Sequence, residues 1–528
     1  MNKDHHLSDK INRSSLGFRS AFFTRFTNHY LGLYTLLIWV LSISSSLEAQ
    51  IISFSKTNLL GANLTEPTSL QFGPDGRLYV SERSGSIFAY TITKVGTNFQ
   101  VTATETIDLV KNIPNHDDNG TLNVFVVNRQ VTGILVMGTA ENPQLYVSSS
   151  DIRVGGGGGG DTNLDTNSGI ISHLTYNGSA WTKVDLIRGL PRSEENHATN
   201  GLEYDASNHK LIVAQGGNTN AGAPSANFDH LCEYALSAAI LEIDLTMLEA
   251  MPILTDLISG EQYVYDIPTL DDPTRPNDIN GNDINDPFGG NDGLNQAKYI
   301  PDGPIFIYST GYRNQYDVVL TELGHLYTWD NGPNQGVGGH PENEGTPNVN
   351  NNWPPGEPGS TGPGPNDGQV NNQDGLHKVT QGYYAGHPTP IRGNPVGAGL
   401  FTHESGPSST GTFRTAITGD PSTTLPIDWP PYPASLRDLR ESDYQNPGVS
   451  DGSLYLIGAS TNGMVEYTAN TFNGAMKGDL LAVSFTGDVF RVDLDANGDL
   501  GPNGVSSIGN QLGIPLDVTT LPNNSQFA

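Results

Sequence analysis

The fold prediction rests on the stretch SLQFGPDGRLYVSER, residues 69–83, and on its repetition. Two runs with alternating apolar residues flank a Gly-Pro-Asp-Gly turn, which is typical of a β-hairpin. The same unit recurs four times, as GILVMGTAENPQLYVSSSD (133–151), GLEYDASNHKLIVAQGG (201–217), YDVVLTELGHLYTWDNG (316–332) and MVEYTANTFNGAMKGDLLAVSFTGDVFRVDL (464–494). A sixth unit, PLDVTTLPNNSQFA (515–528), begins like the first and stops before a second strand.

Regularly recurring hairpins predict an all-β fold, a six-bladed β-propeller of four-stranded antiparallel blades with an incomplete last blade. Two Pro/Gly/Asn-rich gaps, 271–293 and 341–368, lack any periodicity and are interpreted as long insertions on the rim. The Ala- and Leu-rich segment 231–245 favours a helix by composition, but we expect a turn over 231–236 followed by a strand. Residues 50–528 are expected to form one domain.

Residues 1–49 form a predicted targeting segment. Basic residues are spread over 1–30, an apolar run of 13 residues covers 31–43, and a small-residue cleavage site is expected near 49. This order is typical of a secretory signal peptide, and 13 residues are too few for a bilayer span, which needs about 20. The sequence therefore predicts a secreted or periplasmic protein without a membrane span after cleavage. An uncleaved N-terminal anchor is the alternative.

The charge balance excludes one class of partner. The chain of 528 residues has 26 Lys and Arg against 56 Asp and Glu, a net charge of −30. Nucleic-acid binding needs clustered basic residues, so no nucleic-acid partner is expected. Cys232 is the only cysteine, which excludes an internal disulfide and a cysteine-based zinc site.

Polar residues next to the predicted inner strands are the candidate site residues, because a propeller brings these loops together around its channel. His197 precedes the strand 201–204 and is suited to accept a proton near neutral pH. Arg313 precedes the strand 316–320 and is able to bind a carboxylate or polarise a carbonyl group. By residue type alone, a histidine bonded to backbone and a buried structural arginine explain these two residues equally well.

Oxygen-rich turns supply candidate calcium ligands, because hard cations bind oxygen atoms. The turn 330–334, which follows a predicted strand, exposes backbone carbonyl groups, among them those of Gly332 and Pro333. A second candidate is the alternating run of Asp278, Asn280 and Asn282. Ordinary turn chemistry is the alternative in both places.

In combination, these motifs resemble the soluble PQQ-dependent glucose dehydrogenases and the wider glucose/sorbosone (aldose sugar) dehydrogenase family. The resemblance covers about residues 65–500 and rests on three stretches, ENHATNGLEYDASNHKLIVAQGG (195–217), GYRNQYDVVLTELGHLYTWDNGPN (311–334) and DGLHKVTQGYYAGHP (374–388). It implies a six-bladed propeller that oxidises an aldose sugar or related alcohol by hydride transfer to PQQ, with Ca²⁺ as a second cofactor.

The resemblance also implies a role for each matching residue. His197 corresponds to the base that removes the hydroxyl proton, and Arg313 corresponds to the residue that polarises the quinone carbonyl. Asn314 corresponds to a cofactor contact. The backbone carbonyls of Gly332 and Pro333 correspond to ligands of the calcium ion that binds the cofactor. Such a charge arrangement agrees with the physics of hydride removal from a hydroxyl-bearing carbon.

The chain departs from the family at several of these positions. Gln130 lies near the family's substrate glutamine, and Gln130 and Asn196 are the expected substrate-binding residues. Asn196 stands where well-known members carry Asp beside the histidine, so the base lacks a carboxylate neighbour there. The late Lys and Arg that pair with the cofactor carboxylates fall near Thr468 and Thr486 here. The alternative functions are a propeller that binds a glycan or protein without turnover and a calcium-dependent hydrolase on the same architecture.

Overall fold

The structure, a computed structural model, describes residues 52 and 54–521 except 158–159, 276–285, 342–366, 404–410, 415–424, 449–450, 459 and 511. The chain divides into two compact units, Met1–Ser53 and Phe54–Ala528, and the second contains all the strands named below. The predicted signal segment, 1–49, lies outside the described residues. Within the described ranges, no helix has both the length and the apolar character needed to cross a membrane.

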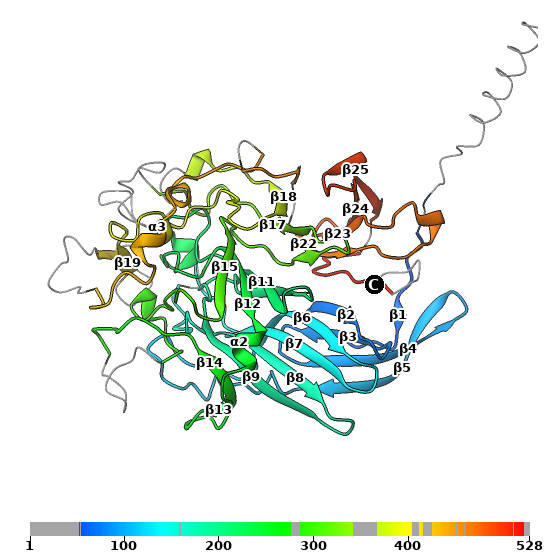
Figure 1. Cartoon of the computed structure of the whole chain (residues 1–528), viewed down its shortest axis with the longest axis horizontal. Helices are drawn as coiled ribbons and strands as arrows, with labels where there is room; N and C mark the ends of the chain where they lie inside the picture. Colours follow the sequence, from blue (N-terminus) through cyan, green and yellow to red (C-terminus); the bar gives the residue numbers. More distant parts are fainter. Residues whose placement is uncertain are drawn as a thin grey trace, which may run out of the picture. The chain divides into compact units, whose positions relative to one another are not determined.

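Most of the described strands belong to five β-sheets (Figure 1). In spatial order, the first sheet contains β1 (Leu59–Leu60), β5 (Asn98–Ile107), β4 (Ile87–Val95), β3 (Leu78–Glu82) and β2 (Pro67–Phe72). The second contains β13 (Leu254–Thr255), β14 (Gln262–Asp266), β9 (Trp181–Leu190), β8 (Gly169–Tyr176), β7 (Pro143–Ser150) and β6 (Gln130–Gly138). The third contains β10 (Thr199–Asp205), β11 (Lys210–Gln215), β12 (Ala239–Asp244) and β15 (Ile305–Thr310).

The fourth sheet contains β16 (Val319–Leu320), β17 (Leu326–Asp330), β18 (Asp374–Val379) and β21 (Tyr455–Ile457). The fifth contains β22 (Thr461–Glu466), β23 (Leu480–Ser484), β24 (Val489–Leu494) and β25 (Leu500–Gly509). A separate hairpin contains β19 (Leu400–His403) and β20 (Gly411–Arg414). The described helices are α2 (Leu245–Glu249), α3 (Pro390–Gly393) and the 3₁₀ turns Ala226–Phe228, Asn291–Gly293, Asp367–Gln369, Ala434–Leu436, Leu439–Ser442 and Phe472–Gly474.

The strands β2, β6, β10, β16 and β22, with the residues that lead into them, contact one another in a closed circle. In order, the bonds are Thr132 Oγ1 to Thr199 O (2.5 Å), Gly201 N to Tyr316 O (2.9 Å), Met464 N to Asp317 Oδ2 (3.0 Å), Gly463 N to Leu516 O (2.8 Å), Leu70 N to Asp517 Oδ2 (2.8 Å) and Ile134 N to Ser69 Oγ (3.3 Å). Because this series returns to β2, the sheets are the blades of a propeller.

The all-β propeller class is confirmed, but the predicted number of six four-stranded blades is wrong. The described residues form five blades, two of which have more than four strands. The segment around Leu516 and Asp517 occupies the place of a sixth first strand, between β22 and β2. No sheet is built on this segment within the described part of the chain, which agrees with a last unit that stops after one strand.

Interruptions of the repeat fall partly where they were expected. The gap 271–293 connects β14 to β15, and the gap 341–368 connects β17 to β18, although most of the second lies outside the described residues. A further interruption between β18 and β21 carries α3 and the β19–β20 hairpin. The strand expected after residue 236 is β12, and it is almost completely buried.

The apolar core lies between neighbouring blades. The second and third blades enclose a cluster that includes Ile187, Leu211 and Leu241, all of them fully buried. The fourth and fifth blades enclose a second cluster around Trp329 and Leu480. Both faces of the middle strands are buried in this packing, which explains why their sequences are nearly continuous apolar runs.

Gly133→Ala is expected to destabilise the protein by about 1–3 kcal/mol. Gly133 lies on β6, where a Cβ atom would be 2.4 Å from Asn200 O and 2.8 Å from Ser148 Oγ. The contact between the second and third blades must therefore open to admit a methyl group. The measurement is urea unfolding, with Gly509→Ala as the control because a methyl group on Gly509 would meet no atom within 4 Å. Equal midpoints for the two variants would contradict the described blade contact.

Candidate functional site

His197 lies in the loop before β10 and is held by backbone contacts. Its Nδ1 atom is 2.9 Å from Gly217 O, so Nδ1 carries the proton and Nε2 has the free lone pair. Nε2 is 3.6 Å from the carboxylate Oε2 of Glu195. Burial, with the positive charge of Arg313, lowers the pKa of His197 well below its ordinary value. The imidazole is therefore neutral near pH 7 and able to accept a proton.

The loop that carries His197 is fixed by the buried guanidinium of Arg192. This group donates to the carbonyl oxygens of Glu195, His197 (3.3 Å) and Arg153 (2.8 Å). Because a guanidinium offers five donors in one plane, a single side chain fixes several turns of backbone. Nothing in the sequence pattern indicated this role for Arg192.

Arg313 lies in the loop before β16 and is also buried. Its Nε atom donates to Asn220 Oδ1 (3.0 Å) and its Nη1 atom to Asn331 O (3.4 Å). Its backbone N–H donates to Asp330 Oδ2 (2.9 Å). Burial lowers the pKa of Arg313 from its ordinary value, but an arginine remains charged at neutral pH.

Phe228 brings the two predicted catalytic side chains together. The centroid of its ring is 5.0 Å from that of the His197 ring and 5.9 Å from the guanidinium carbon of Arg313. Phe228 ends a 3₁₀ turn, Ala226–Phe228, that sequence patterns did not indicate. The structure therefore places a neutral imidazole and a guanidinium at one site, next to a ring that excludes water.

A pocket opens on the Arg313 side of this site. Its lining consists of Arg313, Asp330, Gly332, Pro333, Gly375, His377, Ala385, His387, Tyr444, Gln445, Pro447 and Asp451. The predicted residues Arg313, Gly332 and Pro333 thus share one pocket, whereas His197 is not part of its lining. Burial lowers the pKa of His377 to about 4, so this imidazole is also neutral.

Two carboxylates near the pocket, those of Asp330 and Asp374, accept hydrogen bonds from backbone N–H groups. Asp330 accepts the N–H groups of Arg313 and Asn314, each at 2.9 Å. Asp374 accepts the N–H groups of Gly332 (3.1 Å) and Thr461 (2.8 Å). Burial raises the pKa of Asp330 to about 6 and that of Asp374 to about 7. These carboxylates hold the loops rather than present charge to a ligand.

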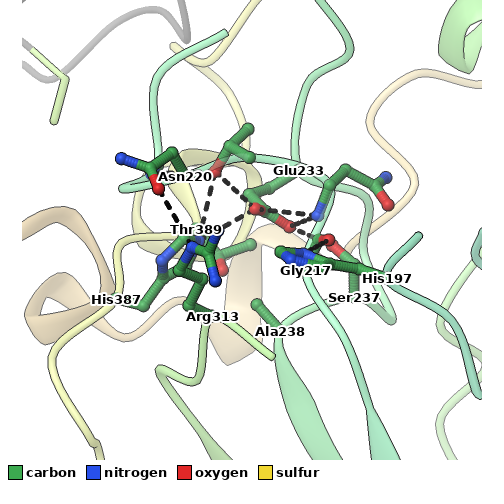
Figure 2. Close-up of polar contacts among 12 residues, drawn as sticks. His197, Gly217, Asn220, Glu233, Ser237, Ala238, Arg313, His387 and Thr389 are labelled. Carbon is green, nitrogen blue, oxygen red and sulfur yellow. Dashed lines mark hydrogen bonds and ion pairs between the residues drawn. The ribbon is translucent and has the colours of Figure 1, made fainter. Parts of the chain in front are cut away.

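Two residues that no sequence pattern singled out, Glu233 and His387, complete the site (Figure 2). His387 Nε2 is 2.9 Å from Glu233 Oε1, and both side chains are buried. Thr219 and Ser237 donate their hydroxyl protons to the same carboxylate. The one signal in the sequence was the position of His387 in the stretch 374–388, which the family resemblance already included.

Three other predicted residues lie outside the pocket lining. Gln130 is buried beside Arg192, with 3.5 Å between Gln130 Oε1 and Arg192 Nη2. The side chain of Asn196 is exposed, and its backbone N–H donates to Glu195. Asn314 accepts a bond from Asn200 at 3.0 Å, which ties the third blade to the fourth. Roles of Gln130 and Asn196 in substrate binding, and of Asn314 in cofactor binding, stay predictions.

The structure describes one of the two predicted calcium sites and not the other. Asp278, Asn280 and Asn282 lie outside the described residues. Gly332 and Pro333 line the pocket, and their backbone carbonyls remain predicted ligands. Among the described residues, no group of three or more His, Cys, Asp or Glu side chains is placed to hold a metal ion.

The described residues fit only part of PQQ. Arg313 fits the carbonyl end of a quinone, because a charged guanidinium-bearing residue lines the pocket. The three carboxylates of PQQ find no comparable partners, since Arg313 is the one Lys or Arg in the described lining. The family's late Lys and Arg, which the resemblance places near Thr468 and Thr486, have no counterpart in the described lining, and Thr486 is exposed and donates to Asp488 Oδ2 (2.7 Å). The lining therefore does not fit the carboxylate end of PQQ.

Stability is expected to fall as the pH rises from 6.5 to 8.5. Burial raises the pKa of Asp165 to about 7, and burial with repulsion from Asp161 and Asp229 raises that of Glu194 to about 8. The folded state thus keeps protons that the unfolded state has lost, so raising the pH favours unfolding. Burial lowers the pKa of His116 to about 4. This histidine makes stability rise with pH, but only below about pH 6.5, where it is protonated in the unfolded state.

Thermal unfolding measures this effect. We expect Tm to be about 3 °C or more lower at the higher pH, and Glu194→Gln to flatten the dependence. A Tm that is constant or rises over this range would contradict the burial of these carboxyl groups.

Comparisons with known proteins give structural likenesses only. No protein-family model matches the chain, and no curated protein sequence matches it. The chain is similar to the PQQ-bound aldose sugar dehydrogenase of Streptomyces coelicolor, with 12% identity, 88% of each chain covered and a TM-score of 0.40. It is also similar to the apo-form aldose sugar dehydrogenase of Escherichia coli, with 14% identity, 88% of this chain and 93% of that chain covered, and a TM-score of 0.40.

A third similar structure is the holo form of the pyranose dehydrogenase PQQ domain from Coprinopsis cinerea. The identity is 12%, 90% of this chain and 95% of that chain are covered, and the TM-score is 0.44. Likenesses at these values assign neither an activity nor a cofactor to this chain.

Proposed function

We propose that this chain is an oxidoreductase that oxidises a hydroxyl group of an aldose sugar or related alcohol. The proposal rests on one observation: the neutral imidazole of His197 and the guanidinium of Arg313 both pack near the ring of Phe228. Removing a hydride from a hydroxyl-bearing carbon requires a base at the hydroxyl and a positive field at the acceptor. The two side chains have these properties.

His197 is the proposed proton acceptor. Its Nδ1–H bond to Gly217 O fixes the tautomer in which Nε2 has the lone pair. A hydroxyl group at Nε2 would give its proton to this nitrogen, while the C–H bond supplies the two electrons and the hydrogen of the hydride. The negative Glu195 carboxylate, 3.6 Å from Nε2, stabilises the imidazolium that results.

Arg313 is the proposed electrostatic stabiliser. Its bonds to Asn220 Oδ1 and Asn331 O fix the plane of the guanidinium at the pocket wall. A fixed positive charge in a site of low polarity stabilises an oxygen that gains negative charge and needs little rearrangement to do so. A quinone bound in the pocket would supply the two-electron acceptor. PQQ with Ca²⁺ at Gly332 and Pro333 is the specific compound to test first.

A dye-reduction assay with the purified protein tests the proposal. The protein is supplied with Ca²⁺ and with either PQQ or a quinone without carboxylates, and a panel of aldoses is tested as substrates. We expect turnover, and the poor fit of the carboxylate end leads us to expect weak PQQ binding. Binding of sugars without dye reduction under every condition would overturn the proposal and favour a non-catalytic propeller. Release of a sugar by hydrolysis of a glycoside would instead favour the alternative function of a calcium-dependent hydrolase.

His197→Ala is expected to lower kcat by about 100-fold, because the base is lost while the pocket stays intact. The control is His209→Ala, since His209 is a partly exposed histidine bonded to Glu249 on the surface. Steady-state kinetics on both variants gives the result. An unchanged kcat in His197→Ala would remove this residue from the chemistry.

We also propose that residues 1–49 direct export, as their basic, apolar and small-residue order predicts. N-terminal sequencing of the protein recovered from an expressing culture gives the result. A mature chain beginning near residue 50 supports export, whereas an intact first residue in the cell fraction contradicts cleavage.

A further inference from the structure

The imidazole of His197 has one ring nitrogen through which a proton can come and go. The side chain is 2% exposed, and its Nδ1–H group is bonded to Gly217 O at 2.9 Å (Figure 2). A backbone carbonyl accepts a hydrogen bond but does not take up and release a proton at neutral pH. A proton that arrives at Nε2 must therefore also leave from Nε2.

The environment of His197 makes a protonated ring unfavourable. Phe228, whose ring centroid is 5.0 Å from that of the imidazole, is buried, and so are Arg192 and Arg313. Burial and the charge of Arg313, with a smaller effect of Arg192, lower the pKa of His197 well below its ordinary value. An imidazolium formed in one turnover must therefore lose its proton before the next turnover begins.

Glu195 connects this buried ring to solvent. Its side chain is 31% exposed, and its Oε2 atom lies 3.6 Å from His197 Nε2. One water molecule or a small closing movement spans this separation, and catalytic contacts in unliganded sites are often this long. The backbone N–H of Asn196 donates to the same Oε2 atom at 2.6 Å, which fixes this oxygen. Oε1 has no hydrogen-bond partner in the part of the chain that the structure describes, so it is available to water.

The loop presents Glu195, and not the preceding glutamate, to the imidazole. Arg192 donates to the backbone oxygens of both Glu195 and His197, so one guanidinium holds the two residues together. The charge of Glu195 also acts on Arg313, where it opposes the effect of burial on the pKa. Glu194, in contrast, is buried and accepts the hydroxyl of Thr162 at 3.1 Å.

We propose that Glu195 is the proton exit of the site. The inference rests on the proposed oxidation, in which His197 takes up one proton in each turnover. The Nε2–H bond breaks and an O–H bond forms at Oε2, directly or through one water molecule. The imidazolium becomes a neutral imidazole, and the carboxylate becomes a carboxylic acid. This acid then gives the proton to bulk water, which restores the carboxylate.

The other charged groups around the ring do not offer this route. The titratable and charged groups on the elements packed against His197 are Arg192, Glu194, Glu195, Asp229, Arg313 and His387. Burial, with repulsion from Asp161 and Asp229, raises the pKa of Glu194 to about 8, so this neighbour of Glu195 is mostly uncharged near pH 7. Glu194→Gln replaces an uncharged carboxyl group by an amide and is therefore the matched control for Glu195→Gln.

Ring NMR of the full chain, labelled with ¹⁵N-histidine, tests the coupling of the two groups without any need for turnover. The signals that are missing in His197→Asn identify those of His197. As the pH is lowered from about 7 to about 4, we expect Nε2 in the wild type and in Glu194→Gln to respond to protonation of the Glu195 carboxylate. This response is expected to be absent in Glu195→Gln. The same pH profile of Nε2 in Glu195→Gln and the wild type would overturn the proposal.

Steady-state kinetics in increasing concentrations of imidazole buffer tests the transfer itself. We expect Glu195→Gln to lower kcat by about 10-fold or more at low buffer concentration, with little change in the KM for sugar. Imidazole in solution then replaces the carboxylate and restores part of kcat, whereas the wild type and Glu194→Gln do not respond to it. A kcat of Glu195→Gln that equals the wild-type value, or that is independent of buffer, contradicts the proton exit. Absence of turnover in the wild type contradicts the proposed oxidation, and the NMR comparison then decides on the coupling of Glu195 to His197.

Discussion

Arg313→Met is expected to lower kcat/KM for sugar oxidation by about 1,000-fold, which is the largest effect on catalysis that the site allows. Methionine keeps the apolar contact with Phe228 but removes the positive charge and every donor of the guanidinium. An acceptor oxygen that gains negative charge in the pocket then has no fixed cation beside it. The loss is expected mainly in kcat, because the charge develops in the transition state.

Arg313→Lys is the matched variant, since it keeps the charge and loses the planar geometry that Asn220 and Asn331 recognise. We expect it to retain more activity than Arg313→Met. Circular dichroism and thermal unfolding show whether each variant is folded. Equal losses in both variants, or an unchanged kcat in Arg313→Met, would mean that the charge of Arg313 is not used in the reaction.

Arg392→Met is expected to destabilise the fold by about 3–5 kcal/mol, the largest effect of a single substitution on stability that we predict. Arg392 is completely buried on α3 and lies 2.5 Å from the carboxylate of Glu441. It also donates to the backbone oxygens of Ala235 (3.1 Å) and Ser237 (2.6 Å), in the turn that follows Glu233. The substitution leaves a buried carboxylate and several carbonyl groups without their donor.

Arg440→Met is the control for this experiment. Arg440 also pairs with a carboxylate at 2.5 Å, that of Asp438, but its side chain is 58% exposed. Exposed ion pairs contribute little to stability, so the urea midpoint of this variant is expected to stay close to that of the wild type. Similar midpoints for Arg392→Met and the wild type would contradict the described burial of the Arg392–Glu441 pair.

Hairpin patterns predicted the blades well because each hairpin is a local feature. Four of the five quoted units correspond to the strand pairs β2–β3, β6–β7, β10–β11 and β16–β17, and the fifth spans β22, β23 and β24. The strands that pair through distant segments, β14 with β9 and β21 with β18, had no local signal. The predicted number of blades was wrong because a blade needs four strands, and the described part of the last unit, 515–521, provides only the first.

Residue type and spacing identified two of the buried side chains that the structure brings together, whereas their chemical roles stay predictions. His197 and Arg313 were identified because each precedes an inner strand, and the structure brings them to one aromatic ring. Glu233 and His387 are 154 positions apart in the chain, and their ion pair depends on the contact between two loops. No local pattern reports such a contact. Gln130 and Asn196 follow from the resemblance alone, and neither lines the pocket.

Oxidation at the hydroxyl-bearing carbon is the central claim, and an aldose with deuterium on that carbon tests it most directly. The rate of dye reduction is compared for the deuterated and the ordinary sugar under single-turnover conditions, with the oxidised product identified by mass spectrometry. We expect slower reduction with the deuterated sugar and one oxidised sugar for each two electrons transferred. Equal rates with no oxidised sugar would show that this C–H bond is not broken and would contradict the account.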